Sequence, residues 1–149
     1  MNFKEQVHQQ FIQLISEKIA MLKTAIADLR NSSANETKSS AGDKYETARA
    51  MLQIDINQLS KQLQEAQTQK AIFDKIDIYT DSKQVIAGSL VKTNKGYLFL
   101  SIAAGKIIVS GETVFALSPQ SPLGLKLLGL KVNDKASINN TIYQIEQIV

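Results

Sequence analysis

The chain has 149 residues, of which 44% are apolar, and it contains no Cys, no Trp and a single His. Such a composition fits one ordinary domain or two small ones with a buried core, and it excludes disulfides, thiolate metal sites, cysteine nucleophiles and histidine-rich metal sites. The formal net charge of +3 comes wholly from residues 84–149, which hold 6 Lys against 3 acidic residues, and this bias is too weak to indicate nucleic-acid binding.

The N-terminal segment Met1–His8 mixes acidic, basic and apolar residues and lacks the basic stub and apolar stretch of a secretion signal. Nowhere do about 18 apolar residues follow one another, which is the length that a membrane-spanning helix needs. The phosphate-binding patterns GxxxxGK(S/T) and GxGxxG are also missing from the sequence. We therefore expect a cytoplasmic protein with no membrane partner and no small-molecule substrate.

Two rows of apolar residues, each with alternating steps of four and three residues, run through the first half of the chain: Ile15, Ile19, Leu22, Ile26 and Leu29, then Leu52, Ile56, Leu59, Leu63 and Ala66. This spacing is typical of a narrow seam between two helices. It predicts two long helices that fold back on each other as an antiparallel coiled coil. Counted from residue 3 to residue 30 at about 1.5 Å per residue, the hairpin would be roughly 40 Å tall.

The ends of the two helices are indicated by residues that favour caps and turns. The first helix is expected to end at Arg30, because short polar residues follow it. The second is expected to begin near Asp43, which can cap it, with Glu46 three residues on as in a capping box, and to end near Lys75. Residues 31–42 between the helices are more numerous and more polar than a minimal helix–helix turn requires.

After residue 77, β-branched and aromatic residues come in short runs that predict strands. The expected strands are Val85–Lys92, Tyr97–Ile102, Lys106–Val109, Thr113–Leu117, Ala136–Ile138 and Thr141–Ile148. Asn94–Gly96 and Asn139–Asn140 have the turn chemistry of hairpins.

One short helix is expected to interrupt these strands. Ser121 can cap it, Pro122 suits its first position and Gly129 can end it. The predicted fold class is therefore α+β, with a helical hairpin in residues 1–78 and a small antiparallel β domain in residues 79–149.

Asp43 and Glu46 are the main candidates for chemistry. Three residues apart at a helix start, they lie on one face, where their oxygens can bind a hard divalent cation or hold a water that attacks phosphorus. Two carboxylates alone do not hold Mg²⁺ stably, so substrate phosphates or ligands from a partner must complete its coordination. The alternative interpretation is that both residues only cap the helix and favour the positive end of its dipole.

The other candidates carry weaker signals. His8, near a helix end, is expected to be a surface or seam residue. Tyr97, Phe99 and Phe115 would either stack nucleic-acid bases or, as aromatic residues on strands more commonly do, fill the core.

Four segments taken together indicate a family: Ala25–Arg30, Gly42-Asp43 with Glu46, Ser121–Leu123 and Leu128–Asp134. In these segments the chain resembles the bacterial Gre transcript-cleavage factors. It also resembles them in the order of its parts, a helical hairpin with an acidic apex followed by a small strand-rich domain. The resemblance covers nearly the whole chain. Its C-terminal part is the more specific, since any helical hairpin can imitate the first part.

The resemblance implies an FKBP-like fold for the C-terminal domain, which in that family docks at the rim of the secondary channel of RNA polymerase. The docking surface that it implies comprises Ser121, Pro122, Leu123, Leu128 and Gly129. Asp43 and Glu46 would then help to hold a second Mg²⁺ and a water that cuts backtracked RNA, and Lys44 and Arg49 would contact RNA or the polymerase. The chain would be no independent enzyme and would have no cofactor of its own. It would share Mg²⁺ with the polymerase and meet the nascent RNA 3′ end indirectly.

Several alternatives stay open. An alignment through Tyr45, Ala48 and Arg49 places the acidic positions of the family on Lys38 and Ala41, which cannot ligate a metal. The chain would then bind the channel without cleaving RNA and act as a regulator or inhibitor, as some relatives of the family do. A helical-hairpin module that holds a protein partner, and a prolyl isomerase suggested by the fold alone, are further alternatives.

Overall fold

The computed structural model describes the backbone of residues 1–36 and 43–149, and the side chains of residues 1–32 and 46–149. The chain forms two compact units, one of Met1–Ile12 with Ala71–Val149 and the other of Gln13–Lys70. Both long helices therefore contribute residues to both units. The domain boundary expected between residues 78 and 79 stays a prediction.

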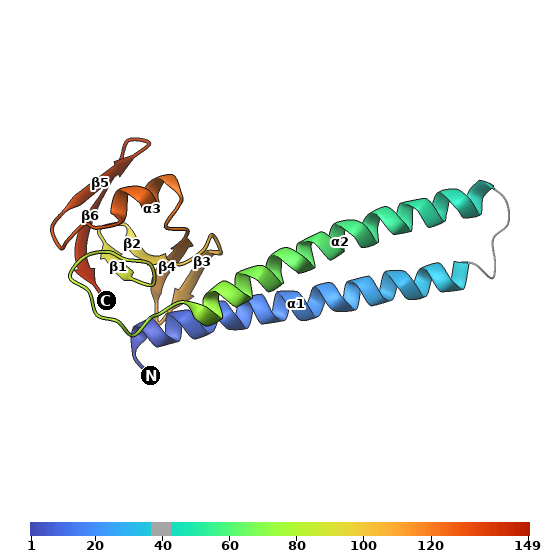
Figure 1. Cartoon of the computed structure of the whole chain (residues 1–149), viewed down its shortest axis with the longest axis horizontal. Helices are drawn as coiled ribbons and strands as arrows, with labels where there is room; N and C mark the ends of the chain where they lie inside the picture. The colour runs from blue at the N-terminus through green and yellow to red at the C-terminus, as the bar shows by residue number, and fades with distance from the viewer. Residues whose placement is uncertain (37–42) are drawn as a thin grey trace. The chain divides into compact units, whose positions relative to one another are not determined.

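Helices α1 (Phe3–Glu36) and α2 (Asp43–Lys75) lie side by side and antiparallel, as predicted (Figure 1). Every predicted seam position, from Ile15 to Leu29 on α1 and from Leu52 to Ala66 on α2, is buried or half-buried. Met21 and Ile54, which lie off the two rows within the hairpin, are exposed. The narrow seam indicated by the heptad spacing is therefore confirmed.

Helix α1 is longer than predicted, since it ends at Glu36 rather than at Arg30. The short polar residues after Arg30 are helical instead of forming a turn. Each residue added to an existing helix gains a backbone hydrogen bond, whereas such residues cost only about 0.5 kcal/mol relative to good helix formers. Helix α2 begins at Asp43 and ends at Lys75, as predicted.

The globular unit contains a six-stranded sheet with the order β3-β4-β2-β1-β6-β5. Its strands are β1 (Leu90–Thr93), β2 (Gly96–Leu100), β3 (Gly105–Val109), β4 (Glu112–Leu117), β5 (Lys135–Ile138) and β6 (Thr141–Ile148). Neighbouring strands are antiparallel except β2 and β4, whose parallel pairing places Leu98 beside Phe115. This pair is parallel because the chain reverses twice, through β3, before β4 returns beside β2.

Tight turns join the hairpins of this sheet. Asn139 and Asn140 have φ values of 49° and 66°, the signature of the type I′ turn that suits the predicted hairpin between β5 and β6. The hairpin of β1 and β2 turns at Asn94–Lys95, also as predicted. Ser110 and Gly111, with φ of 51° and 80°, form the turn between β3 and β4.

Residues 85–89 are not part of a strand, although their composition predicted one. The strand β1 begins at Leu90, and before it Gly88 turns the chain with φ of 90° and donates its N–H to the backbone oxygen of Leu100. A Cβ at Gly88 would stand 2.1 Å from the backbone oxygen of Asp77, so a larger residue does not fit at this position. Val85 is buried in the core next to this turn, which explains its apolar character without a strand.

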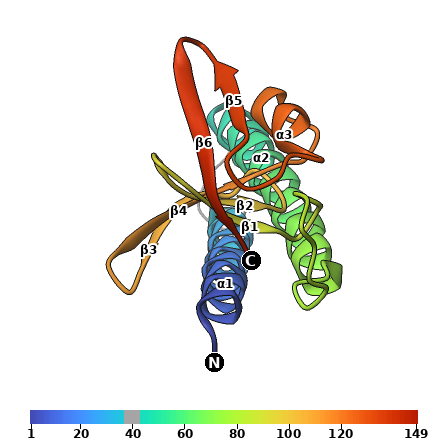
Figure 2. The same cartoon turned by 90° about the vertical axis from the view of Figure 1, so that its left-hand side faces the viewer.

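The two faces of the sheet are covered by different elements (Figure 2). On one face, Phe99 packs against Phe11 of α1 and Phe73 of α2, with ring centroids 6.1 and 6.2 Å away. On the other face, α3 (Pro122–Leu127) and the β5–β6 hairpin cover a core whose buried members are Val85, Val91, Leu98, Leu100, Leu127, Ala136 and Ile145. Ile108 and Phe115 point to this second face but stay exposed. An open apolar surface is left beside the second core.

Candidate functional site

The apex of the hairpin, where chemistry was predicted, is described in part. Helix α2 begins at Asp43, but the side chains of Asp43 and Lys44 lie outside the described residues. Glu46 and Arg49 are exposed and three positions apart, so they share one face of the first turns of α2. The capping and the metal-binding interpretations of Asp43 and Glu46 both remain predictions.

Elsewhere in the described chain, acidic groups do not gather into a metal site. Among the side chains of residues 1–32 and 46–149, no three His, Asp or Glu groups come together in a way that would hold a metal ion. Mg²⁺ takes about six oxygen ligands. Asp43 and Glu46 can supply only part of this number, so a Mg²⁺ bound by these two alone would lack a full set of ligands. None of the described helices has a stretch long and apolar enough to cross a membrane.

His8 has a structural position at the base of the hairpin. Its Nε2 lies 2.7 Å from the backbone oxygen of Phe73 and donates the hydrogen bond, because a carbonyl oxygen only accepts. Carbonyl groups in the last turn of a helix lack a partner within the helix, and His8 supplies one to α2. The imidazole also meets Phe99 edge-on, with ring centroids 6.4 Å apart. His8 thus joins α1 to the end of α2.

The three aromatic candidates from the strands do not form one surface. Phe99 is fully buried beneath α1 and α2, and Tyr97 packs against Phe3 with ring centroids 4.9 Å apart. Phe115 lies on the opposite face of the sheet and is 40% exposed. These three rings therefore do not make a base-stacking platform, and Phe115 belongs to a different feature.

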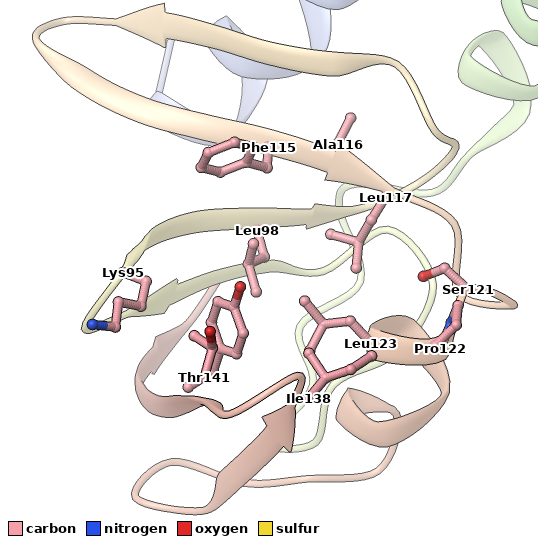
Figure 3. Close-up of a pocket in the computed structure, with 11 residues that line it drawn as sticks. Lys95, Leu98, Phe115, Ala116, Leu117, Ser121, Pro122, Leu123, Ile138 and Thr141 are labelled. Carbon is pink, nitrogen blue, oxygen red and sulfur yellow. The ribbon is translucent and has the colours of Figure 1, made fainter.

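That feature is a groove of about 490 Å³ between the β2–β4 part of the sheet and the layer of α3 with the β5–β6 hairpin (Figure 3). The described residues that line it are Lys95, Leu98, Phe115, Ala116, Leu117, Ser121, Pro122, Leu123, Ile138, Thr141 and Tyr143. Ligand-binding clefts in proteins have volumes of about 300–1,000 Å³ and mostly apolar walls. The groove therefore has the size and the lining of a binding site.

One wall of the groove follows from the local sequence around α3. Ser121 caps the helix: its Oγ accepts the N–H of Gly124 at 3.1 Å and donates to the backbone oxygen of Ser118 at 2.6 Å. Pro122 occupies the start of the helix, as predicted. A Cβ at Gly124 would stand 2.1 Å from the oxygen of Ser118, so the turn and the helix are in direct contact. This packing presents Pro122 and Leu123 to the groove.

The structure brings three of the five suggested docking residues together. Ser121, Pro122 and Leu123 line the groove. Leu128 instead caps the C-terminal end of α3, and Gly129, with φ of 83°, donates its N–H to the backbone oxygen of Val85. The latter two residues thus have a structural explanation at the end of α3, and their docking role stays a prediction.

Several lining residues were not predicted from the sequence, among them Lys95, Leu98, Ile138 and Tyr143. Alternation along each strand indicates which of its residues share a face. It does not indicate that Leu98 lies beside Phe115, because that requires the parallel pairing of β2 with β4.

No family model matches the chain, and no curated protein matches it. Among solved structures, the chain is similar to GreA factor homolog 1 (Gfh1) of Thermus thermophilus, with 15% sequence identity and a TM-score of 0.34, covering 95% of this chain and 94% of that one. A similarity this distant assigns the chain neither to a family nor to a function.

Proposed function

We propose that this chain is a Gre-like factor that binds RNA polymerase, with its hairpin in the secondary channel and its groove on the surface of the enzyme. The observation that carries the proposal is the hairpin, whose helices have 34 and 33 residues. Each helix is therefore about 50 Å long at about 1.5 Å per residue. The two apolar rows bury each other along the seam. In this proposal the polar segment between the two helices acts on another molecule.

The described residues near the apex suit a polar, phosphate-containing partner. Glu46 is exposed at the start of α2, and Arg49 follows it on the same face. In this proposal Asp43 and Glu46 orient a water and offer oxygens to a Mg²⁺ shared with the polymerase, and Arg49 contacts RNA phosphate. The shared Mg²⁺ would supply positive charge at the phosphate under attack. Because the metal and the phosphate belong to the complex, the chain alone would have no enzymatic activity.

The groove supports the docking part of the proposal. Protein interfaces are built around buried apolar and aromatic anchors with a polar rim. Pro122 and Leu123 on one wall and the 40% exposed Phe115 on another provide such a surface. The sequence resemblance implies polymerase docking at Ser121–Leu123, and these residues form part of this wall.

The cleavage activity is tested on halted, backtracked elongation complexes in Mg²⁺ by following the shortening of the RNA. We expect shortening with the wild type and a rate about 10²-fold lower with Asp43→Ala or Glu46→Ala, the order of loss seen when one stabilising group leaves a reacting centre. Asp55→Ala, which removes an exposed carboxylate farther along α2, is the matched control and should cleave like the wild type. Equal shortening by all four proteins would contradict the catalytic role of the apex.

A non-cleaving regulator of the polymerase is the second candidate. It is favoured by the alignment through Tyr45, Ala48 and Arg49, which places Lys38 and Ala41 at the acidic positions. Both candidates predict competition with a known channel-binding factor, whereas only the first predicts RNA shortening. Absence of competition at micromolar concentrations would count against both.

A further inference from the structure

The charged side chains at the groove are positive. Lys95 is the one charged group among its described lining residues, and none of the three acidic residues between positions 84 and 149 lines it. Glu112 begins β4 but points to the other face, because side chains alternate and it is three residues from Phe115. Lys106, the cross-strand partner of Phe115, adds a second cation on the groove face. The surface therefore favours a ligand that carries negative charge.

The polar groups of the groove gather at one of its ends. Asn94 exchanges hydrogen bonds with the backbone of Gln144 at 2.9 and 3.3 Å, which holds the β1–β2 turn against β6. Lys95 in this turn therefore lies at the same end as Thr141 and Tyr143 of β6. Figure 3 shows Lys95 and Thr141 at the end of the groove away from α3.

The hydroxyl groups at this end are available for a ligand. Within the described part of the chain, Oγ1 of Thr141 and Oη of Tyr143 form no hydrogen bond. The hydroxyl of Ser121 at the other end already both donates and accepts in the cap of α3. A hydroxyl can donate to a carbonyl oxygen, and a lysine ammonium can only donate. Lys95 therefore requires an acceptor from the ligand, and the two hydroxyls can donate to further acceptors.

We propose that the groove holds an apolar segment of an RNA polymerase subunit, with an Asp or Glu next to the apolar residues and its carboxylate at the Lys95 end. Apolar side chains of the segment pack between Phe115 and Leu123, and the hydroxyls of Thr141 and Tyr143 donate to its main-chain carbonyls. RNA fits less well, because single strands require a row of cations and several stacked rings. The identity of the partner rests on the proposed function; the chemistry of the segment rests on the groove.

The first test is a binding titration of the full-length chain on purified bacterial core RNA polymerase at several salt concentrations. We expect Phe115→Ala to raise Kd about tenfold or more, as for an aromatic anchor at an interface. Lys95→Glu should raise Kd and flatten its dependence on salt. The controls are Ile142→Ala, an exposed apolar residue whose side chain alternates away from the lining residues Thr141 and Tyr143, and Lys135→Glu, an exposed lysine on β5. Both should bind within about twofold of the wild type, as expected of surface changes away from an interface.

The outcomes separate the two proposals. Binding by the wild type with unchanged Kd for Phe115→Ala and Lys95→Glu would overturn the groove proposal and leave the proposed function standing. If the wild type itself does not bind the polymerase, the proposed function fails, and the segment in the groove cannot belong to a polymerase subunit.

The second test needs no polymerase. The full-length chain is used to select from a random peptide library displayed on phage. We expect enriched peptides that combine apolar residues with an Asp or Glu, and that lose binding to Phe115→Ala and Lys95→Glu. No enrichment, peptides without acidic residues, or peptides that bind both variants equally well would overturn the proposed recognition chemistry.

Discussion

Lys4 is buried in the globular unit, although lysine is rarely buried. Only 5% of its surface is exposed, and its Nζ donates to the backbone oxygen of Val149 at 2.9 Å. Burial lowers the pKa of Lys4 below 10.5, and attraction by Asp77 and Asp81 offsets this only in part. The hydrogen bond from the side chain of Thr80 is the main cause of the lowered pKa of Asp77. Lys4 thus holds the start of α1 to the end of the sheet at an electrostatic cost.

This cost predicts a dependence of stability on pH. Between the lowered pKa of folded Lys4 and 10.5, the unfolded chain holds more protons than the folded one, so the free energy of unfolding rises with pH. Below the folded pKa both states are protonated and the contribution is constant. In urea unfolding from neutral pH to pH 10.5, the wild type should therefore gain stability relative to Lys4→Met. Lys23→Met, an exposed change on α1, should follow the wild type. A difference between wild type and Lys4→Met that does not change with pH would refute this account.

The hairpin depends on a seam that is narrow enough to distinguish neighbouring residues of one helix. Ile56 of α2 is 7% exposed and Ile54 is 56% exposed. Ile56→Ala should lower the free energy of unfolding by about 2–5 kcal/mol, because it leaves a cavity in the seam. Ile54→Ala should change it by less than about 0.5 kcal/mol. Urea unfolding followed by the helical circular dichroism signal measures both, and similar losses for the two variants would contradict a two-helix seam.

The proposed action of the whole molecule separates into docking by the groove and reach by the hairpin. Deleting residues 16–22 and 59–65 removes one heptad from each helix, which keeps the seam in register and shortens the hairpin by about 10 Å. The shortened protein should bind the polymerase with a Kd within about tenfold of the wild type, because the groove is unchanged. It should no longer shorten RNA in backtracked complexes. Cleavage at the wild-type rate would show that the reach of the apex is not required.

The strands were predicted with uneven success for a physical reason. β3–β6 begin and end within about one residue of prediction, since β-branched runs and turn residues are local signals. Residues 85–89 were misassigned because Val85 is apolar for packing in the core, not for pairing in a strand. The end of α1 was misplaced because helix propagation outweighs the weak preference of Ser and Asn for turns.

The helical hairpin and the cap of α3 are already specified by short-range patterns. The heptad spacing and the order Ser121-Pro122 relate residues that are only a few positions apart. The geometry of a single helix is therefore enough to predict a seam from the first and a helix start from the second. The groove has no such local signature. It exists because β4 pairs in parallel with β2, which places Phe115 beside Leu98, and because the turn at Lys95 meets β6. Contacts of this kind join residues far apart in the chain. The groove and its charge are therefore determined only by the arrangement of the strands in space.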